Sequence, residues 1–432
     1  MLQVIGNAEL RKREQEVVDK ELAARQNDSV VLGLTGHLRH CWDAARQAKK
    51  PIEYIMLRGL RQRNGEYEAD KLRDIHEQGG SDIYMGVTEV KCRAAESWLR
   101  DILLDTGTPP WGLNPTPIPD LSPDQTMELQ NAFAAVVTRI VENEGRAPNA
   151  DEMVELKEMV GQEYRFKLLE AADNRAQKMT IKIADQFAQG GWADSFNEFI
   201  TDLVTYPCAF VKGPVVRRQR KLGWAKGADG KTIVEATEII APEFERVDPF
   251  RIYPEPGISN VNEGYLFEHH PLSRTELADL VGVPGYDDDA IRKVLDIGNG
   301  SSWINEDVEL AKDEEERKFH SFSKPTETFD ALEFWGKVTG KMLIEWGLDE
   351  EEIEDKHREY DANVWIVGNY VIKAILNYDP LGEKPYAKTS FIKRPGAFWG
   401  SGIPEIIEDI QNVCNAAARA LVNNMGISSG PQ

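Results

Sequence analysis

The chain has 432 residues, 41% of them hydrophobic and 29% charged, which is enough for about two or three soluble domains with a large core. Its net charge of −22 argues against a surface that holds nucleic acid by neutralising phosphates, although DNA could still move past such a protein without sticking. Zinc, disulfides and a membrane span are not indicated, because the four scattered cysteines form no C-x-x-C pair and no run reaches the roughly 18 apolar residues of a span.

Helical patterns fill the first 104 residues. Residues 7–27 are highly charged and weakly amphipathic, and residues 30–47 form a clearer helix. A short segment over 54–67 carries the turn signal Asn64-Gly65, and residues 88–104 form a strong amphipathic helix. The apolar residues that recur at helical spacing are Leu34, Leu38, Cys41, Trp42 and Ala45 in the second helix, and Val90, Ala94, Trp98, Ile102 and Leu103 in the last.

A proline-rich connection follows these helices. Five prolines between positions 109 and 119 forbid a helix and disfavour strand pairing, so residues 106–123 are expected to be extended. Ser122 and Pro123 suit the cap and first turn of a helix that ends before Gly145. Further helices are expected to begin after Asn149 and to cover residues 173–188 and 192–204.

From Cys208 onward the hydrophobic period changes from about 3.6 residues to about 2, which indicates strands. Ser273 and Glu276 form a capping box for one short helix, and the acidic residues 285–326 are expected to be mobile or peripheral. The predicted hairpins join residues 209–218 to 232–240 across 228–231, residues 331–338 to 341–346, and residues 363–367 to 370–376. The order predicts an α+β fold: a helical N-terminal half, antiparallel β-hairpins, and then a long helix.

No pattern in the chain points to catalysis or to a cofactor. Residues 230–232 resemble the end of a P-loop, but the upstream glycine and the following helix are missing, so we favour a hairpin turn. His269 and His270 are adjacent on an extended strand, where their rings point to opposite faces and cannot readily share an ion. The acidic runs 287–289 and 313–316 offer oxygen ligands to a hard cation, but such runs are usually solvated faces. We therefore predict a protein that is not an enzyme, with no catalytic, cofactor-binding or metal-binding residues.

The closing segment combines a Gly/aromatic turn over 394–402 with a long amphipathic helix from Pro404 to about Gly426. Its acidic and Asn-rich face is expected to be wet, and its apolar face to pack on its own subunit or on a neighbour. An ordinary surface helix explains this pattern equally well. The apolar face consists of Ile406, Ile407, Ile410, Val413, Cys414, Ala417, Leu421 and Met425.

Several segments, in the same order, resemble the portal proteins of tailed bacteriophages, especially those of short-tailed phages. The closing turn and its helix give the best match, and no segment is by itself a chemical signature. The segments are residues 98–119 with their Pro109-Pro110-Trp111 run, residues 196–212, residues 248–256 followed by the helix at 272–277, and residues 398–404 with the helix after them.

This resemblance implies a homo-oligomeric ring, typically of about twelve subunits, at one vertex of the capsid in the virion, assembled in the host cytoplasm. Double-stranded DNA passes non-specifically along the axis of such rings. Their partners are terminase, the major capsid and scaffolding proteins, and tail adaptor proteins. Portal proteins continue into a clip, a second stem helix and a crown, so we expect this chain to be a truncated or partial form.

The resemblance also assigns parts and residues. Residues 1–207 would be the mainly helical part of the wing, residues 208–395 its β-rich part, and residues 396–432 the start of the stem. A helix with a polar face can present that face to a channel. The residues expected to face the channel are Glu408, Gln411, Asn412, Asn415 and Arg419. Those expected to contact a neighbouring subunit are Arg217, Arg218, Arg220 and Trp399.

Two other functions are compatible with the sequence. One is another oligomeric virion protein, such as an adaptor or a scaffold-binding protein. The other is an acidic hydrolase, which rests on no positive feature, because the chain has no G-x-S-x-G elbow and nothing selects one carboxylate pair from 73 acids. For the basic cluster around Arg217, simple protection of a sheet edge is the alternative to an intersubunit role.

Overall fold

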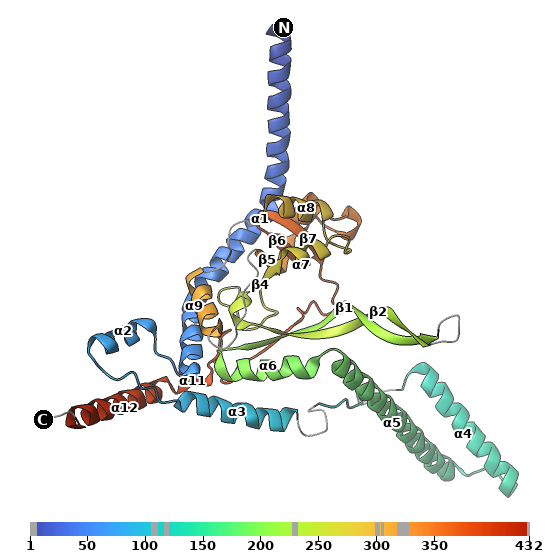
Figure 1. Cartoon of the computed structure of the whole chain (residues 1–432). Coiled ribbons are helices and arrows are strands. Elements are labelled where there is room, and N and C mark those ends of the chain that lie inside the picture. The colour runs from blue at the N-terminus through green and yellow to red at the C-terminus, as the bar shows by residue number, and fades with distance from the viewer. Residues whose placement is uncertain are drawn as a thin grey trace. The chain divides into compact units, whose positions relative to one another are not determined.

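The structure is a computed structural model that describes residues 7–104, 111–115, 121–226, 232–298, 303, 306–317 and 328–429. Within these ranges, the side chains of residues 7–32 and 216–241 are among those outside the description. The predicted α+β class is confirmed, with helices in the N-terminal half, antiparallel sheets after them, and a helix at the C-terminal end (Figure 1). None of the helices in these ranges combines the length and apolar character needed to cross a membrane.

The helices and strands occupy the following residues. The helices are α1 (Asn7–Asn64), α2 (Ala69–Glu77), α3 (Val87–Leu103), α4 (Pro123–Glu144), α5 (Ala150–Gln189), α6 (Trp192–Thr205), α7 (Arg274–Asp279), α8 (Asp288–Ile297), α9 (Glu306–Arg317), α10 (Gly340–Trp346), α11 (Ile403–Ile406) and α12 (Glu408–Ser429). The strands are β1 (Ala209–Lys226), β2 (Thr232–Val247), β3 (Ile252–Pro254), β4 (Leu266–Ser273), β5 (Thr328–Thr339), β6 (Glu359–Val367), β7 (Tyr370–Leu376) and β8 (Tyr386–Thr389).

Contacts divide the chain into two compact units. The first contains Met1–Arg100, Asp194–Val215 and Phe244–Gln432, and the second contains Asp101–Ala193 and Val216–Glu243. The second unit thus gathers two inserted segments of the chain. The division into wing and stem at residues 207 and 395 stays a prediction.

The first unit is built around a five-stranded antiparallel sheet in the order β3-β4-β5-β6-β7. Helix α1 packs on one face of this sheet, where its predicted stripe from Leu34 to Ala45 is buried against Phe267 and Phe334 (Figure 1). Trp42 is the centre of this contact, with 1% of its surface exposed and its indole donating to the Trp303 carbonyl at 3.1 Å. Helix α1 continues through Pro51 to Asn64, and Met56 and Leu57 are buried beyond the proline, so tertiary packing supports the helix on both sides of it.

The opposite face of the same sheet is covered by α7 and α8. Leu277, Ile291 and Val294 from these helices pack against Phe329 and Ile372 of the sheet. Residues 285–326 were expected to be mobile or peripheral, and this prediction is wrong for their described part, because α8 and α9 supply buried side chains. The predicted hairpin over 331–346 is also wrong, because residues 340–346 form α10 instead of a second strand.

A smaller sheet in the order β2-β1-β8 completes the strands, and β1 pairs with β8 from Ala209↔Thr389 to Lys212↔Tyr386. The predicted hairpin of β1 and β2 is thus present, while its turn at residues 227–231 lies outside the described residues.

The second unit contains the helical hairpin of α4 and α5 (Figure 1). Ser122 caps α4 with a capping box, and Gly145 ends it in the left-handed region, as the sequence predicts. Helix α5 has 40 residues, where two shorter helices were expected.

Candidate functional site

The route into α12 begins at a turn that depends on glycine. A Cβ atom added at Gly400 would come within 2.3 Å of the Ile392 carbonyl oxygen, and one at Gly402 within 2.6 Å of the Thr205 carbonyl oxygen. Only glycine permits such close approach of two backbones. The turn therefore seats the start of α11 against the end of α6. The predicted single helix is split at Ile407 into α11 and α12, and Gly426 does not end it.

Helix α12 packs on its own chain through polar side chains. Gln411 Oε1 accepts hydrogen bonds from the backbone nitrogen and the hydroxyl of Thr88, both at 3.0 Å. Gln411 Nε2 donates to Asn415 Oδ1 at 2.9 Å and to the Met85 carbonyl. Asn415 Oδ1 accepts from Met85 N at 2.9 Å, and Gln62 Nε2 of α1 donates to the Thr88 hydroxyl at 2.8 Å. We call these five residues the Gln411 latch.

The latch corrects two of the predicted channel residues. Gln411 is 1% exposed and Asn415 is 2% exposed, so both face the interior of the protein and not a channel. The physical reason lies at the start of α3, whose first backbone N–H groups have no partner within the helix. The two side-chain amides supply acceptors for the residues that lead into this helix, which a sequence pattern on α12 alone does not reveal.

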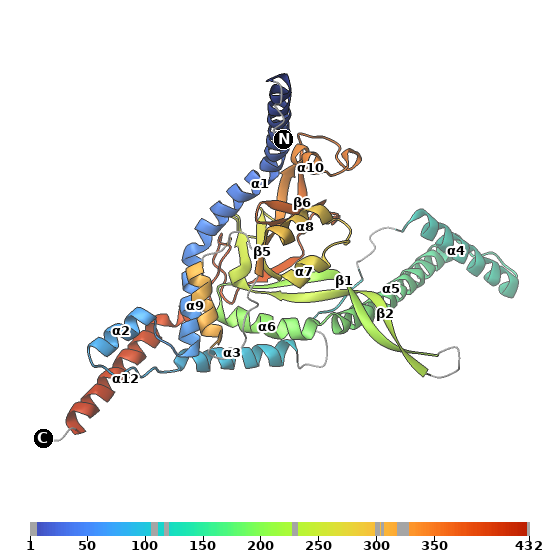
Figure 2. The same cartoon turned by 45° about the horizontal axis from the view of Figure 1, so that its top comes forward.

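The other three predicted channel residues also have partners in the first unit. Glu408 forms an ion pair with Arg58 of α1 at 3.2 Å, and Asn412 accepts a hydrogen bond from Lys71 of α2 at 3.1 Å. The guanidinium of Arg419 lies 5.1 Å from the centre of the Tyr67 ring. Helix α12 therefore runs alongside α2 (Figure 2). For these three residues, a place on a channel stays a prediction.

The apolar face of α12 is exposed, which is the reverse of an ordinary surface helix. Ile410 is 58% exposed and Val413 is 69% exposed, while the amides on the other side are buried. We call this face the α12 stripe. Its exposed members are Ile410, Val413, Leu421 and Met425.

The predicted intersubunit residues divide into two groups. Trp399 is half-buried in its own subunit, where it packs edge-on against Phe210 and Phe398 at 6.0 and 5.1 Å between ring centres. Arg217, Arg218 and Arg220 lie on β1, but their side chains fall outside the description. An intersubunit role for these four residues stays a prediction.

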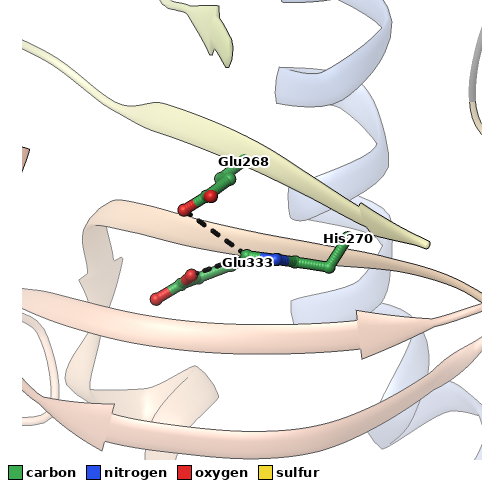
Figure 3. A group of neighbouring side chains, drawn as sticks. All are labelled: Glu268, His270 and Glu333. Carbon is green, nitrogen blue, oxygen red and sulfur yellow. Dashed lines mark hydrogen bonds and ion pairs between the residues drawn. The ribbon is translucent and has the colours of Figure 1, made fainter. Parts of the chain in front are cut away.

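A second notable site is a buried group of charges between the two sheets. Glu268 of β4 and Glu333 of β5 lie directly opposite each other in the sheet register. Like charges in that position destabilise a sheet unless they are neutralised. The ammonium of Lys212, from β1, lies 2.7 Å from Glu268 Oε2 and 2.5 Å from Glu333 Oε2. His270 Nε2 lies 3.4 and 2.9 Å from the same two oxygens (Figure 3). We call these four residues the inter-sheet charge cluster.

The surroundings of the cluster complete its hydrogen bonding. The Tyr386 hydroxyl of β8 donates to Glu268 Oε2 at 2.5 Å, and Asn363 Nδ2 donates to Glu333 Oε1 at 2.9 Å. The Trp335 indole also donates to Glu333 Oε1 at 2.9 Å, and Trp365 stacks on the His270 ring with 4.7 Å between centres. Because Lys212 and Tyr386 come from the smaller sheet, the cluster ties the two sheets together.

Glu268, His270 and Glu333 lie close enough together to hold a metal ion, and they are the candidate metal-binding group found among the described residues. The chemistry of the cluster does not require a metal ion. Lys212 already lies between the two carboxylates, and the charges of Lys212 and a protonated His270 balance both of them. A divalent cation would have to displace a buried ammonium that makes two short contacts. We therefore interpret the cluster as a structural ion-pair network.

The pKa directions agree with this interpretation. Burial by itself would raise the pKa of Glu333, but Lys212 and His270 hold it well below its usual range. Burial by itself would lower the pKa of His270, but the charges of Glu268 and Glu333 outweigh it and raise the pKa to about 9. The imidazole is therefore protonated at neutral pH and remains part of the charge balance.

This shift predicts a loss of stability at alkaline pH. The pKa of His270 rises from 6.5 in the unfolded chain to about 9 in the folded one, so its stabilisation is complete below pH 6.5 and is lost as pH rises to 9. The unfolding free energy of the wild type minus that of His270→Gln is expected to shrink over this window by on the order of 3 kcal/mol. Urea titrations at several pH values measure it.

Two controls make the comparison specific. Lys49 changes the stability in the opposite direction. Burial lowers its pKa from 10.5 in the unfolded chain to about 7 in the folded one, so its contribution to the unfolding free energy rises as pH increases from 7 to 10.5. The difference between two proteins that share Lys49 cancels this effect. His357→Gln is the second control. Because residue 357 is exposed, the unfolding free energy of the wild type minus that of His357→Gln should not change over the same pH range. A wild type whose advantage over His270→Gln stays constant from pH 6 to 9.5 would contradict the charge balance described above.

Sequence reasoning missed this cluster. It placed His269 and His270 on opposite faces, and the structure gives them different partners, since His269 contacts Asp330 at 3.1 Å. His269 is 2% exposed and His270 is half-buried, so both rings are enclosed to some degree by the fold. The available signal was the presence of charged residues inside apolar strands, at Lys212 and Glu333. The sequence does not show which strands bring these charges together.

Residues 225–432 match the family described as Phage SU10 portal protein. A search of curated proteins finds no match. The matched residues include the five-stranded sheet, three members of the inter-sheet charge cluster, the glycine turn and α12.

Proposed function

We propose that this chain, whose residues 225–432 match the phage portal proteins, forms a closed ring of copies at one vertex of the capsid, with DNA passing along the ring axis. The family is structural and not enzymatic. The ring would be of about twelve copies, as in the proteins that the sequence resembles, and would serve DNA packaging and ejection. Terminase, capsid, scaffolding and tail adaptor proteins are its proposed partners.

The observation that carries the proposal is the α12 stripe. A helix that turns buried amides toward its own chain and leaves Ile410 and Val413 exposed has the form of an interface element. Monomeric proteins rarely leave such a continuous apolar face in water. A second copy of the same chain is the occupant that a homo-oligomeric family supplies.

The charge of the chain supports a conduit and not a DNA-holding surface. A net charge of −22 repels the phosphate backbone, so DNA inside the ring would slide without being held by fixed cations. The described arginines near the root of α12 are neutralised by acids, as Arg58 is by Glu408, Arg61 by Glu315 and Arg63 by Glu96. We assign Glu408, Asn412 and Arg419 to the channel side of α12.

The proposal is tested by placing a charge on the stripe. In Ile410→Lys, a lysine at the centre of the stripe would be buried without a partner between copies, so assembly should fail or weaken about 30-fold or more. Ala416→Lys is the matched control, because residue 416 is exposed on the same helix but lies off the stripe. Sedimentation velocity of the full chain measures the assembled fraction.

The expected result is assembly of the wild type and of Ala416→Lys, with Ile410→Lys remaining monomeric at the same concentration. Equal assembly of the three proteins would show that the stripe is not an interface between copies. A wild type that stays monomeric at all concentrations would remove the ring itself.

A further inference from the structure

Helix α3 repeats the inversion seen in α12. Its exposed apolar residues are Val90, Trp98 and Ile102, with exposed fractions of 65%, 68% and 64%. They follow the helical spacing noted in the sequence, so the strongest apolar face of this helix points to water. We call Val90, Ala94, Trp98 and Ile102 the α3 stripe. An exposed tryptophan on a continuous apolar face is a common anchor of an interface.

The other side of α3 shows that this face is not simply mispacked. Thr88, Cys92 and Glu96 are buried against the rest of the first unit. Glu96 is held by Arg63 at 2.6 Å, and Thr88 belongs to the Gln411 latch. The orientation of α3 is therefore set by specific polar contacts, which leave the α3 stripe outward.

We propose that the α3 stripe of one copy is covered by the α12 stripe of the next copy in the ring. This inference rests on the proposed ring and adds which surfaces meet. The two stripes lie on different helices of one chain, so pairing them between copies makes a head-to-tail contact. Contacts of this kind repeat from copy to copy and close into rings when the rotation permits.

Charge favours this pairing. Lys91 is exposed beside the α3 stripe, and Asp409 is exposed beside the α12 stripe. Within the described part of the chain, neither side chain has an ion-pair partner. Placed opposite each other at the rim of an apolar contact, the ammonium and the carboxylate would fix the register of the two helices.

Pairing of two α12 stripes with each other does not account for the observations as well. That contact is isologous and joins only two copies, and it leaves the α3 stripe with Trp98 in water. The head-to-tail pairing covers both stripes with one interface.

The test is zero-length carbodiimide cross-linking of full-length chains, mixed from ordinary and nitrogen-15-labelled preparations. Carbodiimide joins a lysine amine to a carboxylate without a spacer, so it reports direct contact. A peptide pair linking Lys91 to Asp409 and carrying one labelled and one unlabelled partner is expected. Lys91→Arg is the control, because it keeps the charge but offers no amine, and it should assemble while losing this link.

A second variant measures the contribution of the stripe. Trp98→Ala should weaken association between copies about 30-fold, as expected for loss of an interface anchor, while leaving the thermal unfolding of the monomer unchanged. Rings that form without any cross-link between α3 and α12 of different copies, and that tolerate Trp98→Ala, would overturn the pairing while leaving the ring intact. Absence of rings in the wild type is a different result, and it would count against the proposed function itself.

Discussion

Lys212→Met is expected to lower the free energy of unfolding by about 3–5 kcal/mol, the range observed when one partner of a buried ion pair is removed. The substitution leaves Glu268 and Glu333 opposite each other in the sheet, with only His270 to balance two buried carboxylates. It also removes a tie between the two sheets, because Lys212 comes from β1 and the carboxylates from β4 and β5.

The measurement is a urea titration at pH 7, followed by circular dichroism, on the wild type and two variants. Lys337→Met is the matched control, since Lys337 is an exposed lysine on β5, and its loss should cost less than about 0.5 kcal/mol. If the unfolding free energies of Lys212→Met and Lys337→Met differ by less than about 1 kcal/mol, which is within the usual effect of a surface substitution, the cluster does not hold the sheets together. Adding Glu268→Gln and Glu333→Gln to Lys212→Met should recover part of the loss, because the uncompensated charge is gone.

Gln411→Met is expected to release α12 from α3. The substitution roughly keeps the volume of the side chain but removes all the hydrogen bonds it makes to Thr88, Met85 and Asn415. The buried Thr88 backbone N–H would then lose its acceptor on α12, at about 1–3 kcal/mol, while the Met85 carbonyl would keep its hydrogen bond from Val87 N. The Gln411 latch thus connects α12 to the start of α3 through polar side chains.

Hydrogen–deuterium exchange reports this release directly. Amides of residues 85–92 should exchange at least about 10-fold faster in Gln411→Met, since 1.4 kcal/mol of local stability corresponds to a factor of 10. Asn412→Met is the control, because the side-chain amide of Asn412 is next to Gln411 in sequence but is exposed, and it accepts one hydrogen bond, from Lys71. Unchanged exchange in Gln411→Met would mean that the glycine turn alone holds α12 in place.

Local signals made much of the fold predictable. The Ser122 cap and the Gly145 stop bound α4 as expected, because both act through backbone groups of the same helix. The stripe from Leu34 to Ala45 is buried as its spacing predicts, because one face of α1 meets a continuous apolar sheet.

The wrong predictions concern elements whose structure or buried face is determined by contacts between segments distant in the sequence. The polarity of the α12 faces did not show which face would be buried. The polar face is buried because its Gln411 forms hydrogen bonds with Thr88 and Met85, about 320 residues earlier in the chain. Residues 341–346 carry a strand-like pattern but form α10, where Leu343 joins the core against α1. The inter-sheet charge cluster depends on the register of β4 and β5 and on the approach of Lys212, which no local pattern encodes.

Copies of this chain are proposed to close into a ring whose contacts include the α12 stripe. Electron microscopy of the purified full chain, with image classes sorted by view, shows whether such a ring forms. End-on classes of the wild type are expected to show a closed ring of subunits around a central hole, and these classes should be lost in Ile410→Lys. Monodisperse single subunits in the wild type, or rings unaffected by Ile410→Lys, would contradict it.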